Sequence, residues 1–382
     1  MRNKNMFMIF LLIWTIFNLR SLTGSEAEAT DLPKAYLISN VPHHKQITDF
    51  SCGPGSLEML YDYWGKDIDQ KAISDVVRLS LIGTYTWDMR RAGCFSHLSA
   101  AQGRFFPYDA PDSGYPERSL GYASFDYSSD TMWWSTLKGL IVKDIPVVLL
   151  MKYAPDDDAA HYRVLVGYDE EKGVVYFLDP WYNDPDMMEN PDGTVTWSMA
   201  DFENAWNYAG YGTSRPYWGT VMIPWKVILR TTDETTSGSV IEVTAEITYP
   251  CPQPFDCSAY TATDTCAEII LPPNTRLLEG SSTVYIGLLQ AGESVTVTWQ
   301  VRLDTDVPGS SIRVTTSGLI SGSVPEIDWK DEDDECNKNG KKEKKDKDGT
   351  KDKDTGDRKG NEDYYPAYIY TDKIGGEASI EL

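Results

Sequence analysis

The stretch "ITDFSCGPGSLEMLYDYWGKD", residues 47–67, predicts a helix that begins at a cysteine. Pro54 stands just inside the start of the pattern and Gly65 just past its end, which is where proline and glycine usually flank a helix. Four apolar side chains between them recur at the spacing of one helix face: Leu57, Leu60, Tyr61 and Trp64. The sequence therefore predicts a helix with one buried face and with Cys52 at its N-terminus.

Cys52 occupies the end of the helix that favours negative charge. The unpaired backbone N–H groups and the dipole at a helix N-terminus lower the pKa of a thiol and raise its thiolate fraction. A buried inert cysteine would more naturally lie within the apolar face. Two alternatives stay open, a disulfide with Cys94 and a core thiol. A thiolate nucleophile also needs a base and a group that orients the base.

The candidate base is His161, which lies in "AHYRVLVGYDEEKGVVYFLDPW", residues 160–181. Two apolar runs around a polar turn are typical of a β-hairpin. A tight turn predicts that Tyr168 faces Lys172, and continuing the ladder sets His161 opposite Asp179, with Cβ atoms about 5 Å apart. A slip of one residue would separate the two side chains. The alternatives are a histidine bonded to a backbone carbonyl and an aspartate that only begins a turn.

Gln46 completes the candidate set. It precedes Cys52 by six residues, on the segment that leads into the helix. Its side-chain amide, together with the backbone N–H of Cys52, is suited to stabilise the oxyanion of acyl transfer. We expect the neighbouring His43 and His44 to be solvated loop residues, and the acidic residues 156–158 to be solvated as well.

Composition limits the classes of partner. The chain has 382 residues and a net charge of −23, which argues against a nucleic-acid partner because a polyphosphate backbone needs a clustered basic face. No CxxC pair or HExxH motif is present among the six cysteines and four histidines, so no metal site and no cofactor are predicted. Cys251 and Cys257 flank "PQPFD", and a small disulfide loop is expected there.

The N-terminal segment has the pattern of a secretory signal peptide. Arg2 and Lys4 precede the apolar run "MFMIFLLIWTIF", residues 6–17, and small residues follow at Ala27 and Ala29. Residues 1–29 are therefore expected to direct export, and the mature protein is expected to be secreted or extracellular. If the segment is not cleaved, it would anchor the protein at the cell surface.

The pattern changes near residue 230, which predicts two domains. Residues 36–230 mix helical patterns with short apolar runs, as in an α+β domain, whereas 231–382 show short alternating runs, as in an all-β sandwich. Residues 328–363 are almost wholly charged, and we expect them to be disordered. The β pattern resumes after them, so they are expected to be an insertion between strands.

Several blocks together resemble one family. Gln46, "SCGPGSLEMLYDYWG", "IPVVLL", "AHYRVLVGYD" and "FLDPW" occur in this order in papain-like cysteine peptidases, and they look most like the branch of bacteriocin-processing, double-glycine leader peptidases. The resemblance covers about residues 38–225. It implies an α+β fold with N-terminal helices packed on an antiparallel sheet. It also implies that Cys52 is the nucleophile, His161 the general base and acid, Asp179 the orienting group and Gln46 the oxyanion donor.

The second domain resembles immunoglobulin-like domains in its pattern of strands, carried by "STVYIGLLQAGESVTVTWQVRL", residues 282–303. The resemblance implies a sandwich that acts as a spacer, positions substrate, or attaches to a cell surface or polymer. The whole sequence predicts an exported cysteine peptidase that acts on peptides or proteins. The alternatives are an inactive papain-like domain in a surface-binding protein, and a thiol-dependent transamidase or deamidase.

Overall fold

The computed structural model describes residues 32–100, 118, 120–181, 194–210, 213, 215–232, 238–304, 309–328, 364–365 and 367–382. Apart from residues 32 and 33, the described residues belong to one compact unit, Lys34–Leu382. The predicted signal peptide and the predicted disordered insertion 328–363 lie almost wholly outside the described residues. Among the described helices, none is long and apolar enough to cross a membrane. The predicted domain boundary near residue 230 stays a prediction.

The first half of Lys34–Leu382 contains the helices of the protein that the structure describes. They are α1 (Cys52–Tyr63), α2 (Gln70–Val76), α3 (Thr86–Ala92), α4 (Trp134–Ile141) and α5 (Met199–Trp206). The prediction for α1 is confirmed, because Cys52 is its first residue and Gly65 follows its end with φ of +80°. Three of the four predicted apolar positions are fully buried, and Trp64 is half-buried.

These helices pack on an antiparallel sheet. Its strand order is β2-β7-β3-β4-β5-β6, with β1 paired to β4. The strands are β1 (Ala35–Leu37), β2 (Ala123–Tyr127), β3 (Val147–Ala154), β4 (Asp157–Asp169), β5 (Val174–Leu178), β6 (Thr194–Ser198) and β7 (Gly219–Ile223). The predicted α+β architecture, with N-terminal helices on an antiparallel sheet, is confirmed.

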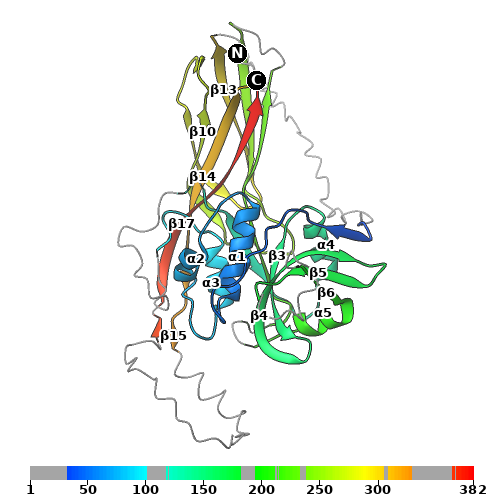
Figure 1. Ribbon diagram of the computed structural model, residues 1–382. Helices are drawn as coiled ribbons and strands as arrows, with labels where there is room; N and C mark the ends of the chain where they lie inside the picture. The colour runs from blue at the N-terminus through cyan, green and yellow to red at the C-terminus, as the bar shows by residue number, and fades with distance from the viewer. Residues whose placement is uncertain are drawn as a thin grey trace, which may run out of the picture. The chain divides into compact units, whose positions relative to one another are not determined.

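Both faces of the central strands of this sheet are buried. Successive side chains of a strand point to opposite faces, and β3 shows the result. Val148 and Leu150 belong to the core that includes Leu57 of α1, whereas Leu149 belongs to the core that includes Phe202 of α5. Figure 1 shows α1, α2 and α3 gathered together and α4 and α5 at the other side of the strands. The helix that carries Cys52 therefore lies against the face of β4 and β3.

The second half is all β. Two four-stranded antiparallel sheets have the orders β12-β10-β14-β17 and β11-β13-β9-β8. The strands are β8 (Lys226–Thr231), β9 (Val240–Thr248), β10 (Thr261–Ile270), β11 (Thr275–Leu277), β12 (Thr283–Gln290), β13 (Ser294–Leu303), β14 (Ser311–Val324) and β17 (Tyr368–Glu381). A further pair, β15 (Ile327–Asp328) and β16 (Tyr364–Tyr365), lies on either side of the charged run, and the disordered insertion stays a prediction. The immunoglobulin-like assignment stays a prediction.

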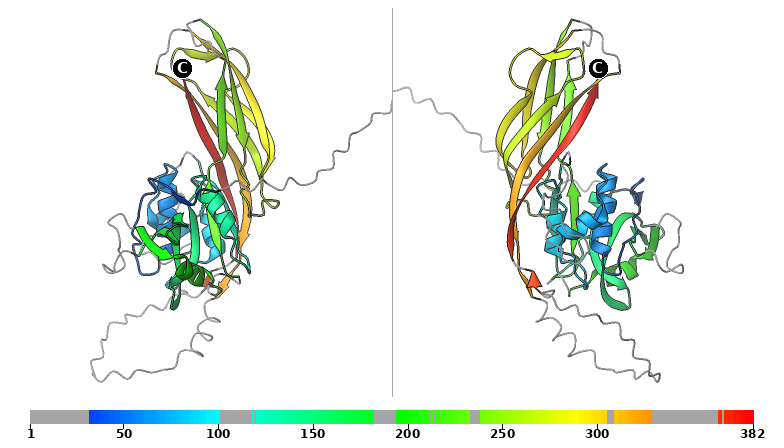
Figure 2. Two further views of the ribbon diagram at one scale, coloured as in Figure 1. Left: turned by 90° about the vertical axis from the view of Figure 1, so that its right-hand side faces the viewer. Right: turned by 60° about the vertical axis from the view of Figure 1, so that its left-hand side comes forward.

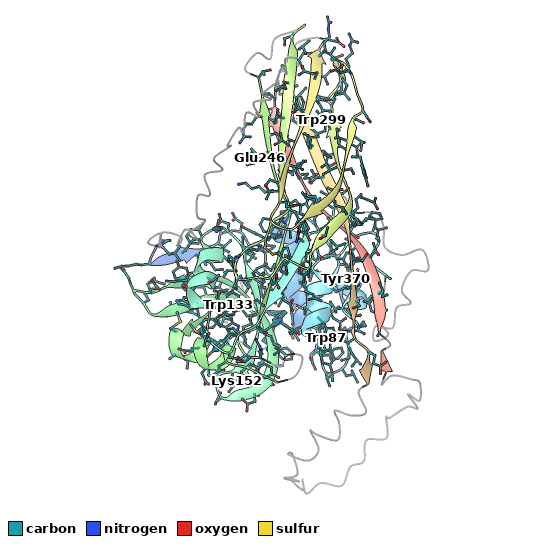
Figure 3. The ribbon with its side chains drawn as sticks, turned by 180° about the vertical axis from the view of Figure 1, so that it is seen from behind. Trp87, Trp133, Lys152, Glu246, Trp299 and Tyr370 are labelled. Atoms are coloured by element: carbon teal, nitrogen blue, oxygen red, sulfur yellow. A yellow bond between two sulfur atoms is a disulfide. The ribbon has the colours of Figure 1, made fainter. Side chains whose placement is uncertain are left out.

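The long strands β14 and β17 connect the two halves. They pair along fourteen positions and run from the sandwich past the helices (Figure 2). Gly375 of β17 donates its N–H to the carbonyl of Gly121 and accepts from the N–H of Trp225, both at 3.0 Å. Arg91 of α3 lies 5.4 Å from the ring centroid of Tyr370, which is labelled on β17 in Figure 3. These contacts make β17 part of the support of α3.

The described cysteines settle two expectations. Cys251 and Cys257 form the predicted disulfide, with Cα atoms 5.8 Å apart. Cys52 and Cys94 are both buried free thiols, so the alternative of a bridge between them is wrong. They belong to two different hydrophobic cores, which explains why they do not pair.

Candidate active site

Cys52 is presented by the first turn of α1. Cys52 is 8% exposed. The backbone N–H groups of a first helical turn have no acceptor within the helix. The next residue is a glycine for a packing reason: a Cβ on Gly53 would lie 2.7 Å from the sulfur of Met89 and 3.3 Å from Thr84. The absence of that side chain lets α3 and the segment before it approach the start of α1.

His161 lies on β4 and connects Cys52 to Asp179. The imidazole Nε2 is 2.7 Å from Oδ1 of Asp179. The imidazole also acts on the side chain of Cys52: each of the two groups shifts the pKa of the other. All three side chains are less than a tenth exposed. A thiol, an imidazole and a carboxylate are thus buried together, with the imidazole interacting with both of the others.

The predicted hairpin exists, but its predicted register is wrong. Tyr168 pairs with Val175 and not with Lys172, because four residues and not three separate the ends of β4 and β5. A register shift between Leu165 and Gly167 changes the ladder again, and Val164 then pairs with Leu178. Extending that register by one position puts Arg163 across from the aspartate. The imidazole of the predicted base reaches the carboxylate from the neighbouring position on the same face of β4.

Arg163 is a site residue that the sequence reasoning missed. It is 1% exposed, and its Nε donates to Oδ2 of Asp179 at 2.6 Å. Its two terminal nitrogens donate to the carbonyls of Lys152 and Tyr153 at 3.0 and 2.6 Å. The guanidinium carbon lies 4.6 Å from the ring centroid of Trp197. The available signal was the i, i+2 spacing with His161, which places two strand side chains on one face.

The charges of the three polar groups support one another. Burial alone would raise the pKa of Asp179, but Arg163 and His161 hold that pKa well below its usual range. Burial lowers the pKa of His161, yet the charge of Asp179 outweighs it and the pKa is raised. Burial also raises the pKa of Cys52, and the hydrogen bond and charge of His161 more than offset it, so the thiol pKa is lowered. The arrangement favours a thiolate beside an imidazolium.

Gln46 is brought to the same place by backbone hydrogen bonds. Its N–H donates to the carbonyl of Pro180 at 2.9 Å, next to Asp179. The side chain is 5% exposed, and its Nε2 donates to the carbonyl of Thr48 at 2.7 Å. An amide nitrogen carries two hydrogens, so a second donor stays available.

The expectation that His43 and His44 are solvated loop residues is wrong. His43 Nε2 lies 2.6 Å from the carbonyl oxygen of Asp179, and His44 Nε2 hydrogen bonds the carboxylate of Asp62 on α1. These contacts tie the segment before Gln46 both to the end of the hairpin and to the helix. Residues 156–158 are exposed, as expected.

The first half of the chain is similar to one known family. Residues 38–214 match the model of the Peptidase_C39 like family. The resemblance to papain-like, bacteriocin-processing peptidases is thereby confirmed for the first half of the chain, which we call the peptidase-like domain. A comparison with curated proteins finds no match.

Three solved structures are similar to the peptidase-like domain. The peptidase domain of Streptococcus ComA, a bi-functional ABC transporter, is 15% identical over 48% of this chain and 98% of its own, with a TM-score of 0.30. A double glycine motif protease from an AMS/PCAT transporter, in complex with its leader peptide, is 16% identical over 49% and 96%, with a TM-score of 0.28. Xylellain, a cysteine protease from Xylella fastidiosa, is 11% identical over 51% and 87%, with a TM-score of 0.34.

Proposed function

We propose that the protein is an exported cysteine peptidase in which Cys52 is the nucleophile, His161 the general base and acid, Asp179 the orienting group and Gln46 an oxyanion donor. The observation that carries this proposal is that a buried free thiol at the start of α1 interacts with His161, whose Nε2 lies 2.7 Å from a buried carboxylate. A nucleophile, a base and a group that orients the base are what covalent catalysis by a thiol requires.

The reaction follows from these positions. The Cys52 thiolate attacks the carbonyl carbon of the peptide bond, and the carbonyl π electrons move to the oxygen. As this intermediate collapses, the C–N bond breaks and His161 transfers its proton to the leaving amine. A water molecule then attacks the thioester, with His161 accepting a proton, and the carboxylic acid product leaves as the C–S bond breaks. The thiolate of Cys52 and the imidazolium of His161 are thereby restored.

The developing oxyanion is stabilised by two donors. One is the backbone N–H of Cys52, in the first turn of α1, and the other is the second Nε2 hydrogen of Gln46. Loss of one such donor commonly lowers kcat by about 10²- to 10³-fold. The segment of Gln46 is held against Pro180, so the donor and the hairpin that carries the base are linked by a backbone hydrogen bond.

Export and attachment form the second part of the proposal. Residues 1–29 act as a signal peptide, and the mature protein is secreted or held at the cell surface. Its partners are peptides or proteins as substrates, with the C-terminal β domain attaching to a cell surface or polymer. N-terminal sequencing of the exported protein tests the cleavage: a new N-terminus close to Ala29 is expected, and an intact Met1 would contradict it.

The test of the activity uses the mature protein and Cys52→Ala. We expect a library of internally quenched peptides to contain members that the wild type cleaves and Cys52→Ala does not. Iodoacetamide should alkylate Cys52 with an apparent pKa below that of an ordinary thiol. Rapid alkylation without cleavage would contradict the peptidase and favour a binding protein. Product peptides that carry an added primary amine would favour a transamidase.

A further inference from the structure

One buried amide holds the backbone on both sides of Gln46. Gln70 is the first residue of α2 and is 3% exposed. Its Oε1 accepts from the N–H of Ile47 at 2.9 Å, and its Nε2 donates to the carbonyl of Lys45 at 3.0 Å. The side chain thus pairs with residues 45 and 47 as a neighbouring strand would, and the residue between them is the proposed oxyanion donor.

The same amide also contacts the helix that carries the nucleophile. Its Nε2 donates to Oε2 of Glu58 on α1 at 2.7 Å, and Ser51, immediately before Cys52, places its Oγ 3.2 Å from Oε1. Both hydrogens of Nε2 therefore have acceptors, and Oε1 accepts from Ile47 and shares the single hydroxyl hydrogen of Ser51 with the carbonyl of Thr48. The segment of Gln46 and the start of α1 are held by one group.

A glycine on α1 allows this close packing. A Cβ on Gly55 would lie 3.2 Å from Cβ of Pro180, 3.5 Å from Cα of Gln46 and 3.5 Å from Nε2 of Gln70. Three segments that are distant in the sequence therefore meet at the first turn of α1. Because the packing is this close, a displacement of the Gln70 amide is transmitted to the backbone of Gln46.

We propose that Gln70 is a positioning residue that holds residues 45–51, here called the oxyanion loop, in the geometry needed for catalysis. The inference rests on the proposed function. Every hydrogen bond of the Gln70 side chain described above goes to the oxyanion loop or to Glu58. The arrangement from Cys52 to Asp179 is held by other contacts. Gln70 therefore acts on the stabilisation of the oxyanion and not on the formation of the thiolate.

This division predicts a difference between two reactions of Cys52. Peptide hydrolysis passes through a tetrahedral oxyanion, whereas alkylation by iodoacetamide displaces iodide at a saturated carbon and forms none. Gln70→Met, which keeps the length of the side chain and loses its amide, is expected to lower kcat/KM for the best peptide of the library by about 10- to 100-fold, with most of the loss in kcat. The rate of alkylation should stay within about twofold of the wild type, and its pH dependence should be unchanged. This is the result expected when a substitution affects only the transition state of hydrolysis.

A matched control comes from the C-terminal domain, where Gln300 donates to Glu242 at 3.0 Å. Gln300→Met removes an amide of the same kind and should leave both reactions unchanged. The inference would be overturned if Gln70→Met hydrolysed the peptide with the kcat/KM of the wild type. It would also be overturned if hydrolysis and alkylation were slowed by the same factor. A wild type that alkylates but cleaves no peptide would overturn the proposed function, and the inference would fall with it.

A second set of variants covers the case in which Gln70→Met does not fold. Gln70→Glu keeps the acceptor for Ile47 and places a second carboxylate against Glu58, so hydrolysis should fall. Adding Glu58→Gln restores a donor and acceptor pair between the two positions. The kcat/KM of the double variant should therefore be at least about tenfold higher than that of Gln70→Glu alone, as expected for coupled neighbours. Failure of the double variant to recover any hydrolysis, at unchanged alkylation, would overturn the inference.

Discussion

Nε of Arg163 donates to Oδ2 of Asp179 at 2.6 Å, on the carboxylate whose other oxygen lies 2.7 Å from His161 Nε2. Oδ1 also accepts from the backbone N–H of Trp181 at 2.8 Å. The carboxylate is therefore held from three sides, and it cannot turn away from the imidazole without breaking a charged hydrogen bond. The guanidinium of Arg163 also compensates the negative charge of Asp179, which is buried.

Replacing Arg163 by methionine should damage both stability and catalysis. Loss of one partner of a buried ion pair costs about 3–5 kcal/mol in the free energy of unfolding. Arg163 lowers the pKa of His161, so its loss should move the basic limb of the kcat/KM profile to higher pH. Urea unfolding and pH profiles measure the two effects. Arg230→Met, which removes an exposed pair with Glu246, is the control and should change neither. An unshifted basic limb would show that Arg163 acts only on stability.

Asp179→Asn keeps the shape of the side chain and removes its charge. The charge of Asp179, the largest cause that raises the pKa of His161, is then lost, so this pKa should fall and the basic limb should move to lower pH. We expect kcat to fall by about 10²-fold. The raised pKa of His161 also contributes stability that is fully present below about pH 6.5 and is lost as the pH rises through the folded-state pKa.

Urea midpoints across this range test the stability effect. The loss of stability with rising pH should be smaller in Asp179→Asn than in the wild type. Asp169→Asn, at the end of β4, the strand that carries His161, should keep the wild-type basic limb. An identical pH dependence of unfolding in the wild type and Asp179→Asn would contradict the assignment of the charge of Asp179 as the cause.

Gly55→Ala should lower activity even though alanine favours helices. An added Cβ would lie 3.2 Å from Pro180, so α1 must move away from the hairpin end. The matched control is Gly139→Ala on α4, where the space around a Cβ is open within 4 Å, and it should raise the free energy of unfolding by about 0.5–1 kcal/mol. Peptide hydrolysis and thermal unfolding of both variants give the comparison. Equal activity of the two variants would show that the contact relaxes without cost.

Asp372→Ala should destabilise the peptidase-like domain from the other half of the chain. Asp372 lies on β17, its Oδ1 accepts from Ser99 Oγ at 2.7 Å, and its Oδ2 is 3.6 Å from Nε of Arg91. Removal leaves a buried guanidinium without its ion pair, at a cost of about 3–5 kcal/mol. Glu377→Ala on the same strand, whose carboxylate is 36% exposed, should cost less than about 1 kcal/mol.

Tryptophan fluorescence and far-UV circular dichroism of Asp372→Ala should report one shared transition at a lower midpoint. Twelve tryptophans occur in the chain, and Trp133 and Trp299 label the two halves (Figure 3). Two separate transitions, with the peptidase-like domain unchanged, would show that β17 does not support α3.

Local patterns decided much of what the sequence could predict. The helix from Cys52 needed only its flanking proline and glycine and the spacing of its apolar residues, and the hairpin needed only two apolar runs around a turn. The alternation of apolar and polar residues along the second half was sufficient to predict an all-β domain. The short distance in sequence between Cys251 and Cys257 was sufficient to predict their disulfide. Each of these features depends on neighbours within a few residues, where the covalent chain limits the possible arrangements.

The assembly of the site was decided by tertiary structure. The register of the hairpin depends on a shift at Gly167, whose missing Cβ makes room for the carbonyl of Tyr36 on β1. The hydrogen-bond partners of Arg163 and Gln70 lie 10 to 25 residues away in the sequence, and a buried arginine or glutamine carries no local signal of its partner. The sequence by itself determined which residue types are available and which begin a helix or a strand. Only the packed sheet and helices decided which of them meet, because that depends on close contact between surfaces that the chain brings together only when it folds.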